Sequence, residues 1–287
     1  MTFELPTMFL LLYLTIFFIG LAVGSFLNVV IDRIPRGESI MNSRSHCEHC
    51  RHTLHWLDLI PIVSFVLQRG KCRYCKKHIS SYYPLVEGVT AVLFIFIAFF
   101  ILDFLRHYSD LRYILTVTYL FYIVSSLIVI FFTDIKYGII PFKVVFYAIL
   151  VAALWHIFSP SIPVTEFETR LLIVRSMSFF NYLLSAFGAF GAFLLLFIGT
   201  KQRGLGFGDV VFAFLMGFLL GFPKIVLGLY IAFLSGALLS TALVVVGRKK
   251  MRGGVIPFGP FLVGGTIISL IWGNTLITLI LSYLLSR

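Results

Sequence analysis

The sequence predicts an all-α membrane protein that crosses the bilayer about eight times, with a small cytoplasmic zinc-binding segment between the first two membrane helices. Three observations carry this prediction. Sixty per cent of the 287 residues are hydrophobic and only 12% are charged, whereas about 25% of the residues in a soluble domain are charged. The apolar residues form long runs, and the one sizeable polar stretch contains all four cysteines.

The expected membrane helices are apolar runs long enough to cross about 30 Å of hydrocarbon. The sixth of them is short and is the weakest of the set. The runs cover residues 8–31, 84–102, 113–133, 139–158, 179–199, 209–222, 224–247 and 258–285. We therefore expect three regions: a first membrane helix (1–31), a cytoplasmic segment (32–83) and a membrane core (84–287).

The orientation follows from the basic residues. The first run is too long for the core of a signal peptide and no Lys or Arg precedes it, so we expect it to remain in the mature protein. Alternate loops, on the side of residues 32–83, carry 17 of the 23 Lys and Arg residues. Because basic residues concentrate in cytoplasmic loops, the N-terminus is expected outside. The net charge of +11 then reflects orientation and contact with the anionic lipid bilayer, and no nucleic-acid partner is expected.

The polar segment contains two Cys-x-x-Cys pairs, with 21 residues between the second cysteine of one pair and the first of the next. Each pair supplies two thiolates from one tight turn, which is typical of a tetrahedral zinc site. Four sulfur ligands leave no open position for a catalytic water, so the site is expected to be structural. The predicted ligands are Cys47, Cys50, Cys72 and Cys75.

Two other interpretations of this segment stay open. The cysteines would form a pair of disulfides in an oxidising compartment, although the cytoplasm is reducing. His46, His49, His52 and His55 recur every three residues, and one of them would replace a cysteine or bind a second metal. Histidines in such a polar stretch are more often solvated.

Two aspartates are the catalytic candidates. Asp209 follows the glycine-rich stretch 204–208 and precedes an apolar run, and Asp134 ends another run. An ionisable side chain costs about 2.5–3.5 kcal/mol at mid-bilayer, which makes both residues functional candidates. Under the predicted orientation both lie at the cytoplasmic face. Small residues such as Gly188, Gly191 and Gly217 would let the intervening helices pack closely.

Two neighbouring carboxyl groups can share one proton, because like charges at short distance cannot both form at low cost. The ionised group can then deprotonate water while the protonated group hydrogen-bonds a peptide carbonyl, which is aspartic-protease chemistry. From the dipoles of their own helices, Asp209 is expected to be the base and Asp134 the protonated partner. The alternative is that each carboxylate caps a helix or pairs with Lys136 or Lys201. The sequence has neither His-Glu-x-x-His nor Gly-x-Ser-x-Gly, the signatures of competing proteases.

The sequence resembles the type IV prepilin peptidases, the bifunctional leader peptidases and N-methyltransferases of pilus, type II secretion and competence systems. The resemblance runs nearly end to end. It rests on Gly24-Ser25-Phe26-Leu27-Asn28-Val29-Val30 with Arg33 and Pro35, the four cysteines, Asp58-x-Ile60-Pro61-x-x-Ser64, Ser80-x-x-Tyr83-Pro84-Leu85-Val86-Glu87, Asp134 with Ile140-Pro141, Gly206-x-Gly208-Asp209, and Ile256-Pro257-Phe258-Gly259-Pro260.

The resemblance implies an aspartic endopeptidase of the bacterial cell membrane, active at the cytoplasmic face, with Asp134 and Asp209 as the catalytic pair. It implies cleavage of the basic leader of prepilins or pseudopilins after a glycine, then N-methylation of the new N-terminus with S-adenosylmethionine. Where the family favours an acidic residue and a lysine, this chain has Phe142 and Val211, so local charge pairing and fine substrate preference transfer less well. Glu87 is a candidate partner for a basic or N-terminal substrate group, or else a helix-start carboxylate.

Two alternative functions stay open. One is a peptidase that lacks methyltransferase activity, since the sequence has no glycine-rich fingerprint for S-adenosylmethionine. The other is a polytopic proton or cation transporter, with the aspartates as a relay and the cysteine segment as a zinc module. The transporter alternative leaves the blocks at 24–30 and 256–260 unexplained, and no inverted repeat is evident.

Overall fold

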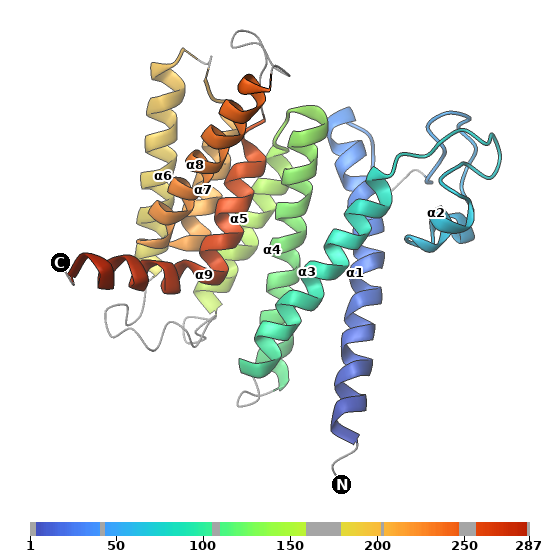
Figure 1. The fold of residues 1–287 in the computed structure, drawn as a ribbon, viewed down its shortest axis with the longest axis horizontal. Helices are drawn as coiled ribbons and strands as arrows, with labels where there is room; N and C mark the ends of the chain where they lie inside the picture. The colour runs from blue at the N-terminus through green and yellow to red at the C-terminus, as the bar shows by residue number, and fades with distance from the viewer. Residues whose placement is uncertain are drawn as a thin grey trace. The chain divides into compact units, whose positions relative to one another are not determined.

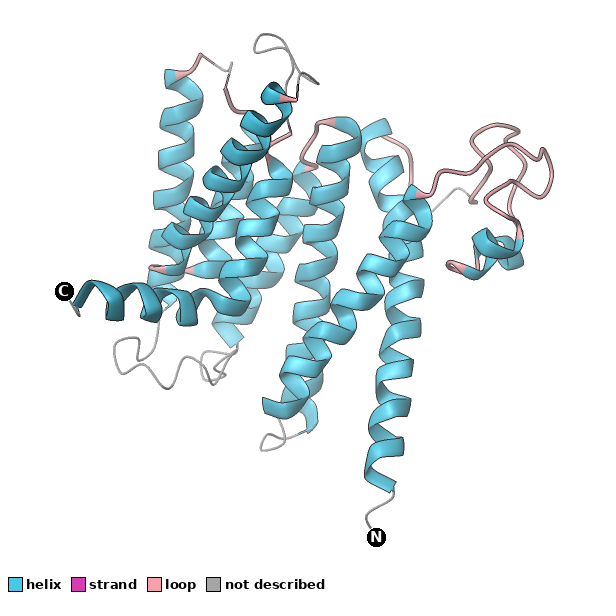
Figure 2. Ribbon diagram, viewed as in Figure 1, coloured by secondary structure: helices cyan, strands magenta, loops and turns pink. Residues whose placement is uncertain are grey.

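The computed structural model describes residues 4–40, 44–104, 110–158, 179–201, 204–246 and 257–285. Within these ranges the structure is helical, and its only extended pairing consists of isolated β-bridges (Figures 1 and 2). The helices are α1 (Glu4–Arg36), η1 (Trp56–Leu59), α2 (Val63–Leu67), α3 (Tyr82–Phe104), α4 (Asp110–Tyr137), α5 (Phe142–Phe158), α6 (Phe179–Gly199), α7 (Phe207–Leu220), α8 (Lys224–Val245) and α9 (Gly259–Leu285). The prediction of an all-α protein is confirmed.

Six of these described helices are long and apolar enough to cross a membrane. Their candidate spans are Leu10–Arg36, Tyr82–Phe99, Ile114–Tyr137, Phe179–Gly199, Lys224–Leu243 and Gly259–Leu285. Two further apolar helices, α5 and α7, occupy the remaining predicted runs but have only 17 and 14 residues. At 1.5 Å per residue, α7 is only about 21 Å long. A multi-pass membrane protein is therefore supported, and the count of eight crossings stays a prediction.

Contacts divide the chain into an N-terminal unit, residues 1–129, and a C-terminal unit, residues 130–287. We describe each by itself, and the predicted division into 1–31, 32–83 and 84–287 stays a prediction. In the N-terminal unit α1 packs along α3 through two glycines one turn apart. A Cβ at Gly20 would lie 2.6 Å from Ala91 Cα, and one at Gly24 would lie 2.6 Å from Glu87 Cα. This is the small-x-x-x-small packing by which membrane helices approach closely.

In the C-terminal unit α7 lies at the centre and contacts α5, α6, α8 and α9. Ten of its residues are buried, and Phe212 and Leu215 are fully so. Four neighbouring helices therefore cover α7, and contacts with protein rather than with lipid surround most of it. Gly217 packs directly on the α6 backbone, as expected. Gly188 and Gly191 do not mediate close packing, because a Cβ at either would have no neighbour within 4 Å.

Candidate functional site

Asp134 lies in the last turn of α4 and is only 6% exposed. Its Oδ2 accepts a 2.8 Å hydrogen bond from the backbone N–H of Gly259, the first residue of α9. The contact requires glycine, because a Cβ at residue 259 would lie 2.6 Å from that oxygen. The carboxylate therefore sits on the N-terminus of a helix 125 residues further along the chain, a position that favours negative charge.

This contact changes the electrostatic environment on which the choice of Asp209 as general base depends. That expectation uses only the C-terminus of α4, where partial negative charge disfavours an ionised Asp134. The N-terminus of α9 acts in the opposite sense, so the helix dipoles no longer decide which carboxyl group carries the proton. The division of roles between Asp134 and Asp209 stays a prediction.

Asp209 lies in the first turn of α7 and is 8% exposed. Its Oδ2 accepts a 2.9 Å hydrogen bond from Gly206 N–H, and its own N–H donates to Gly206 O at 3.1 Å. The helix-capping interpretation is therefore confirmed for Asp209. Gly208 fixes the position of this turn, since a Cβ there would lie 2.9 Å from Ile140 Cβ in the segment that follows α4.

The structure brings the two aspartates together, and Asp134 and Asp209 interact electrostatically. Both carboxylates are buried and accept hydrogen bonds from neutral backbone N–H groups. Among the described residues neither forms an ion pair, so the pairing with Lys136 or Lys201 that the sequence left open is not made. Two like groups in this setting favour a shared proton, as the aspartic-protease hypothesis requires.

The four cysteines also meet. One sulfur from each of Cys47, Cys50, Cys72 and Cys75 lies within 4.8 Å of all the others, and Cys47 Sγ is 3.9 Å from Cys75 Sγ. In a tetrahedral site with zinc–sulfur bonds of about 2.3 Å, two sulfurs are about 3.8 Å apart. All four are free thiols, and a disulfide needs about 2.05 Å. The sulfur separations fit a metal such as zinc, and they are too long for the pair of disulfides that the sequence left open.

The two Cys-x-x-Cys turns have the same backbone geometry. In each, the first cysteine donates its N–H to the carbonyl five residues later, and the residue four positions later donates back to the first cysteine, at 2.9–3.0 Å. That fourth-position residue has a positive φ in both turns, 56° at Arg51 and 57° at Lys76. Burial acts to raise the pKa of Cys47, but hydrogen bonds from the backbone N–H groups of Cys50 and His49 lower it to about 7, which favours the thiolate that binds metal.

The histidines of the segment do not join this cluster in the described structure. The His52 ring instead contacts the Tyr74 ring at a tilt of 37°, with ring centroids 3.8 Å apart, and His46 Nδ1 lies 3.4 Å from Arg44 O. Asp58 attaches the second turn to η1. Its carboxylate accepts a 3.1 Å hydrogen bond from the Tyr74 hydroxyl and pairs with Arg73 at 3.2 Å.

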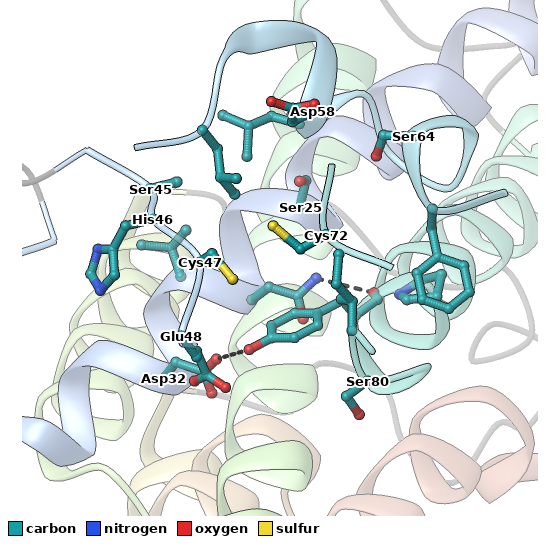
Figure 3. A pocket seen from close by; sticks show the side chains of 18 of the residues that line it. Ser25, Asp32, Ser45, His46, Cys47, Glu48, Asp58, Ser64, Cys72 and Ser80 are labelled. Atoms are coloured by element: carbon teal, nitrogen blue, oxygen red, sulfur yellow. Dashed lines mark hydrogen bonds between the residues drawn. The ribbon is translucent and has the colours of Figure 1, made fainter. Parts of the chain in front are cut away.

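A cavity of about 560 Å³ lies within the N-terminal unit, between the α1–α3 pair and the cysteine segment (Figure 3). Cys47, Cys72 and Asp32 contribute to its wall, and Asp32 accepts a 3.0 Å hydrogen bond from the Tyr83 hydroxyl. Its volume is in the range of about 300–1,000 Å³ that small-molecule sites occupy. The cavity was not predicted from the sequence.

Glu87 reaches this cavity and is 8% exposed. The interpretation as a helix-start carboxylate is wrong, because α3 begins at Tyr82 and has no acidic residue in its first turn. Instead Glu87 Oε2 accepts a 2.7 Å hydrogen bond from Ile62 N–H. Ile62 has φ 58°, an unusual value for a β-branched residue. The turn that begins with Ile60-Pro61 therefore directs the Ile62 N–H toward Glu87.

The sequence did not predict a role for several residues of the two sites. Asn28 and Gly259 lay within blocks that carried the resemblance, yet no role followed for them from the sequence alone. The four-residue spacing of Gly20 and Gly24 is a signal that would have indicated close packing of the first helix on another. No comparable local signal announces that Gly259 contacts Asp134.

Comparison with known proteins finds two family models, one for the segment that contains the cysteines and the cavity and one for the segment that contains the two aspartates. The Bacterial Peptidase A24 N-terminal domain matches residues 18–101, which include the cavity and the cysteines. The Type IV leader peptidase family matches residues 121–241, which include both aspartates. A prepilin leader peptidase/N-methyltransferase of Bacillus subtilis strain 168 is 32% identical over 263 residues, covering 92% of this chain and 95% of the relative.

The chain belongs to the type IV leader peptidase family. Proteins with the same name from Aeromonas salmonicida and Legionella pneumophila are each 26% identical, with 94% and 95% of this chain covered and the same shares of the relatives. No solved structure matches. The resemblance seen in the sequence motifs is confirmed, and the transporter alternative has no support from these relatives.

Proposed function

We propose that this leader peptidase is a membrane-embedded aspartic endopeptidase that removes the basic leader of prepilins or pseudopilins after a glycine. It then methylates the new N-terminal amine with S-adenosylmethionine. The enzyme lies in the bacterial cell membrane with its N-terminus outside and its aspartates at the cytoplasmic face, the orientation that the distribution of basic residues supports.

The observation that carries this proposal is the meeting of Asp134 and Asp209. They come from α4 and α7, are both buried, and interact with each other rather than with a cation among the described residues. A single buried carboxylate at a helix end is explained by capping, whereas the electrostatic interaction between two of them is not. Their mutual repulsion costs stability unless a proton is shared.

In the proposed reaction, the ionised carboxyl group takes a proton from a water molecule that attacks the scissile carbonyl. The protonated carboxyl group hydrogen-bonds the carbonyl oxygen and stabilises the charge that develops there. The tetrahedral intermediate then collapses with cleavage of the C–N bond, and the carboxyl group that took the proton from water gives it to the leaving amine. No covalent enzyme intermediate forms. The N–H groups of Gly259 and Gly206 hold one oxygen of Asp134 and Asp209 respectively, which leaves the other oxygen of each group for water and substrate.

The substrate class suits this location. A prepilin begins with a basic leader followed by an apolar helix, so the helix can lie in the bilayer while the leader stays in the cytoplasm. The scissile bond then lies at the depth of the predicted cytoplasmic helix ends, where Asp134 and Asp209 are expected.

The zinc ion is proposed as a structural cofactor. Cys47, Cys50, Cys72 and Cys75 would hold it in a closed tetrahedral site, and metal binding would supply folding free energy to the segment that forms one wall of the cavity. S-adenosylmethionine, when bound, supplies an electrophilic methyl group for the N-terminal amine.

The test is co-expression with a prepilin and mass measurement of the product, which reports leader removal and methylation separately. Asp134→Asn and Asp209→Asn should each abolish cleavage while the protein stays folded and membrane-inserted. Asp110→Asn, the same change at the first residue of α4, is the control and should cleave normally. Cleavage by either of the first two variants at the wild-type rate would reject the aspartic mechanism, and leader loss without added methyl would leave a peptidase only.

A further inference from the structure

The cavity of the N-terminal unit contains a buried carboxylate that no cation balances within the part of the chain that the structure describes. Glu87 accepts hydrogen bonds from Ile62 N–H and from the Ser25 hydroxyl, and both donors are neutral. Among the described residues it forms no ion pair. A buried carboxylate is costly unless it is paired, so a positively charged ligand would stabilise this arrangement.

The arginines of the cavity wall are engaged elsewhere. Arg33 donates to the backbone carbonyls of Ser39, Ile40 and Arg44 at 3.1–3.2 Å. Arg36 pairs with Glu48 at 3.0 Å. Their charges organise the loop that follows α1, and the electrostatic interactions found for Glu87 include neither of them.

Asn28 supplies a second, independent indication of a ligand. It is 6% exposed, lines the cavity, and its Nδ2 donates to Tyr83 O at 3.1 Å. Its Oδ1 is buried and has no hydrogen-bond partner in the described structure. Buried amide oxygens are nearly always paired, and a donor on a bound molecule would satisfy this one.

We propose that this cavity is the binding site for S-adenosylmethionine, with Glu87 as the counter-ion of the sulfonium and Asn28 Oδ1 as an acceptor for a ligand N–H or O–H. The proposal rests on the methyltransferase half of the proposed function. The cavity has the volume of a small-molecule site, and the aromatic rings of Phe65 and Tyr83 in its wall offer a surface for adenine. The other cation of the reaction, the substrate amine, belongs to a polypeptide rather than to a small molecule.

The charge on sulfur provides the test, because S-adenosylhomocysteine lacks only the methyl group and that positive charge. Binding of each compound to the purified, zinc-loaded, full-length enzyme is measured by calorimetry. Glu87→Gln should weaken binding of S-adenosylmethionine by about 30-fold or more, the range for loss of one partner of a buried charge pair. Binding of S-adenosylhomocysteine should change by less than about threefold. Glu87→Asp, which keeps the charge, should retain much of the preference.

Glu38→Gln is the matched control. Glu38 also lines the cavity but is exposed, so water screens its charge and the ratio of the two affinities should stay at the wild-type value. Leader cleavage and zinc content serve as folding checks in every variant. Asn28→Leu should weaken both ligands by a similar factor, since Asn28 Oδ1 does not read the sulfonium charge.

Three results would overturn the assignment. An unchanged affinity ratio in Glu87→Gln would place the sulfonium elsewhere. Normal binding of both compounds by that variant, together with lost methylation, would assign Glu87 to the substrate amine. Failure of the wild-type enzyme to bind either compound while it still cleaves the leader would reject both the site and the methyltransferase activity, and would leave the peptidase proposal standing.

Discussion

The two units of the protein bring polar groups together in different ways. In the N-terminal unit the cysteines are set by two short turns with matching hydrogen bonds, so each half of the site forms within eight residues, from His46 to Thr53 or from Lys71 to His78. In the C-terminal unit Asp134 and Asp209 come from different helices, and each depends on a glycine where another segment packs. The first site is local and polar, whereas the second is a product of helix packing. Substitution of a cysteine ligand should therefore disrupt the first site, whereas a methyl group added at a packing glycine should disrupt the second.

Loss of a metal ligand is expected to have the largest effect. In Cys72→Ser the zinc content should fall from one per chain to well below one, and residues 44–81 should become sensitive to limited proteolysis, because structural zinc supplies about 10 kcal/mol of folding free energy in small domains. Metal analysis and proteolysis of the purified variant measure this. Some leader cleavage should survive, since both aspartates belong to the other unit. Metal-free wild-type protein with all four thiols oxidised would refute the zinc site.

A single methyl group should impair the aspartate pair. In Gly259→Ala the new Cβ would lie 2.6 Å from Asp134 Oδ2, so the carboxylate must move. A displacement of about 1 Å lowers turnover by about 100-fold. The rate of leader removal in detergent or liposomes measures the loss, and zinc content should stay at the wild-type value.

Gly264→Ala is the control for that change. It lies five residues further along α9, and its Cβ would meet nothing within 4 Å. It should cleave at close to the wild-type rate. Equal rates for the two variants would show that the contact between Gly259 and Asp134 does not position the carboxylate.

The same contrast explains how far the sequence could predict the molecule. The cysteine site was predictable because its ligands follow from spacing inside a short polar segment. The helices were predictable because each corresponds to a long apolar run in the sequence. The helix boundaries differ from the predicted ones by a few residues: α3 was expected to begin at 84 and begins at Tyr82.

What could not be predicted depends on contacts between distant segments. Asp134 meets Gly259 across 125 residues, and Glu87 meets Ile62 across 25 residues through a backbone N–H that no side-chain motif encodes. The burial of α7 among its neighbours also escapes a reading of hydrophobicity alone, since lipid-facing and buried helices are equally apolar. The glycines one turn apart on α1 mark a close helix contact, whereas Gly188 and Gly191 on α6 do not.

Packing of the first helix should have an intermediate effect. In Gly24→Ala the added Cβ would lie 2.6 Å from Glu87 Cα, and overpacking of this kind costs about 1–3 kcal/mol. Separation of α1 from α3 should also distort the cavity, so methylation should decrease more than cleavage. Thermal unfolding and product mass measure the two effects. Gly191→Ala, where the Cβ has no close neighbour, should leave both unchanged, and equal losses of cleavage and methylation in Gly24→Ala would contradict the separation of the two sites.

The smallest expected effect tests whether the two cysteine turns are equivalent. Arg51 and Lys76 hold φ values of 56° and 57°, and this left-handed conformation costs a residue with a Cβ about 1 kcal/mol that glycine does not incur. Arg51→Gly and Lys76→Gly should therefore each raise zinc affinity, by up to about fivefold less the chain entropy that glycine adds to the unfolded segment, when measured by competition with a chelator. Lys77→Gly is the control. Residue 77 is not among those with positive φ, so glycine there adds only chain entropy to the unfolded segment and should lower the affinity slightly. An increase at one turn and a decrease at the other would show that the matching hydrogen bonds do not make the two halves of the site energetically alike.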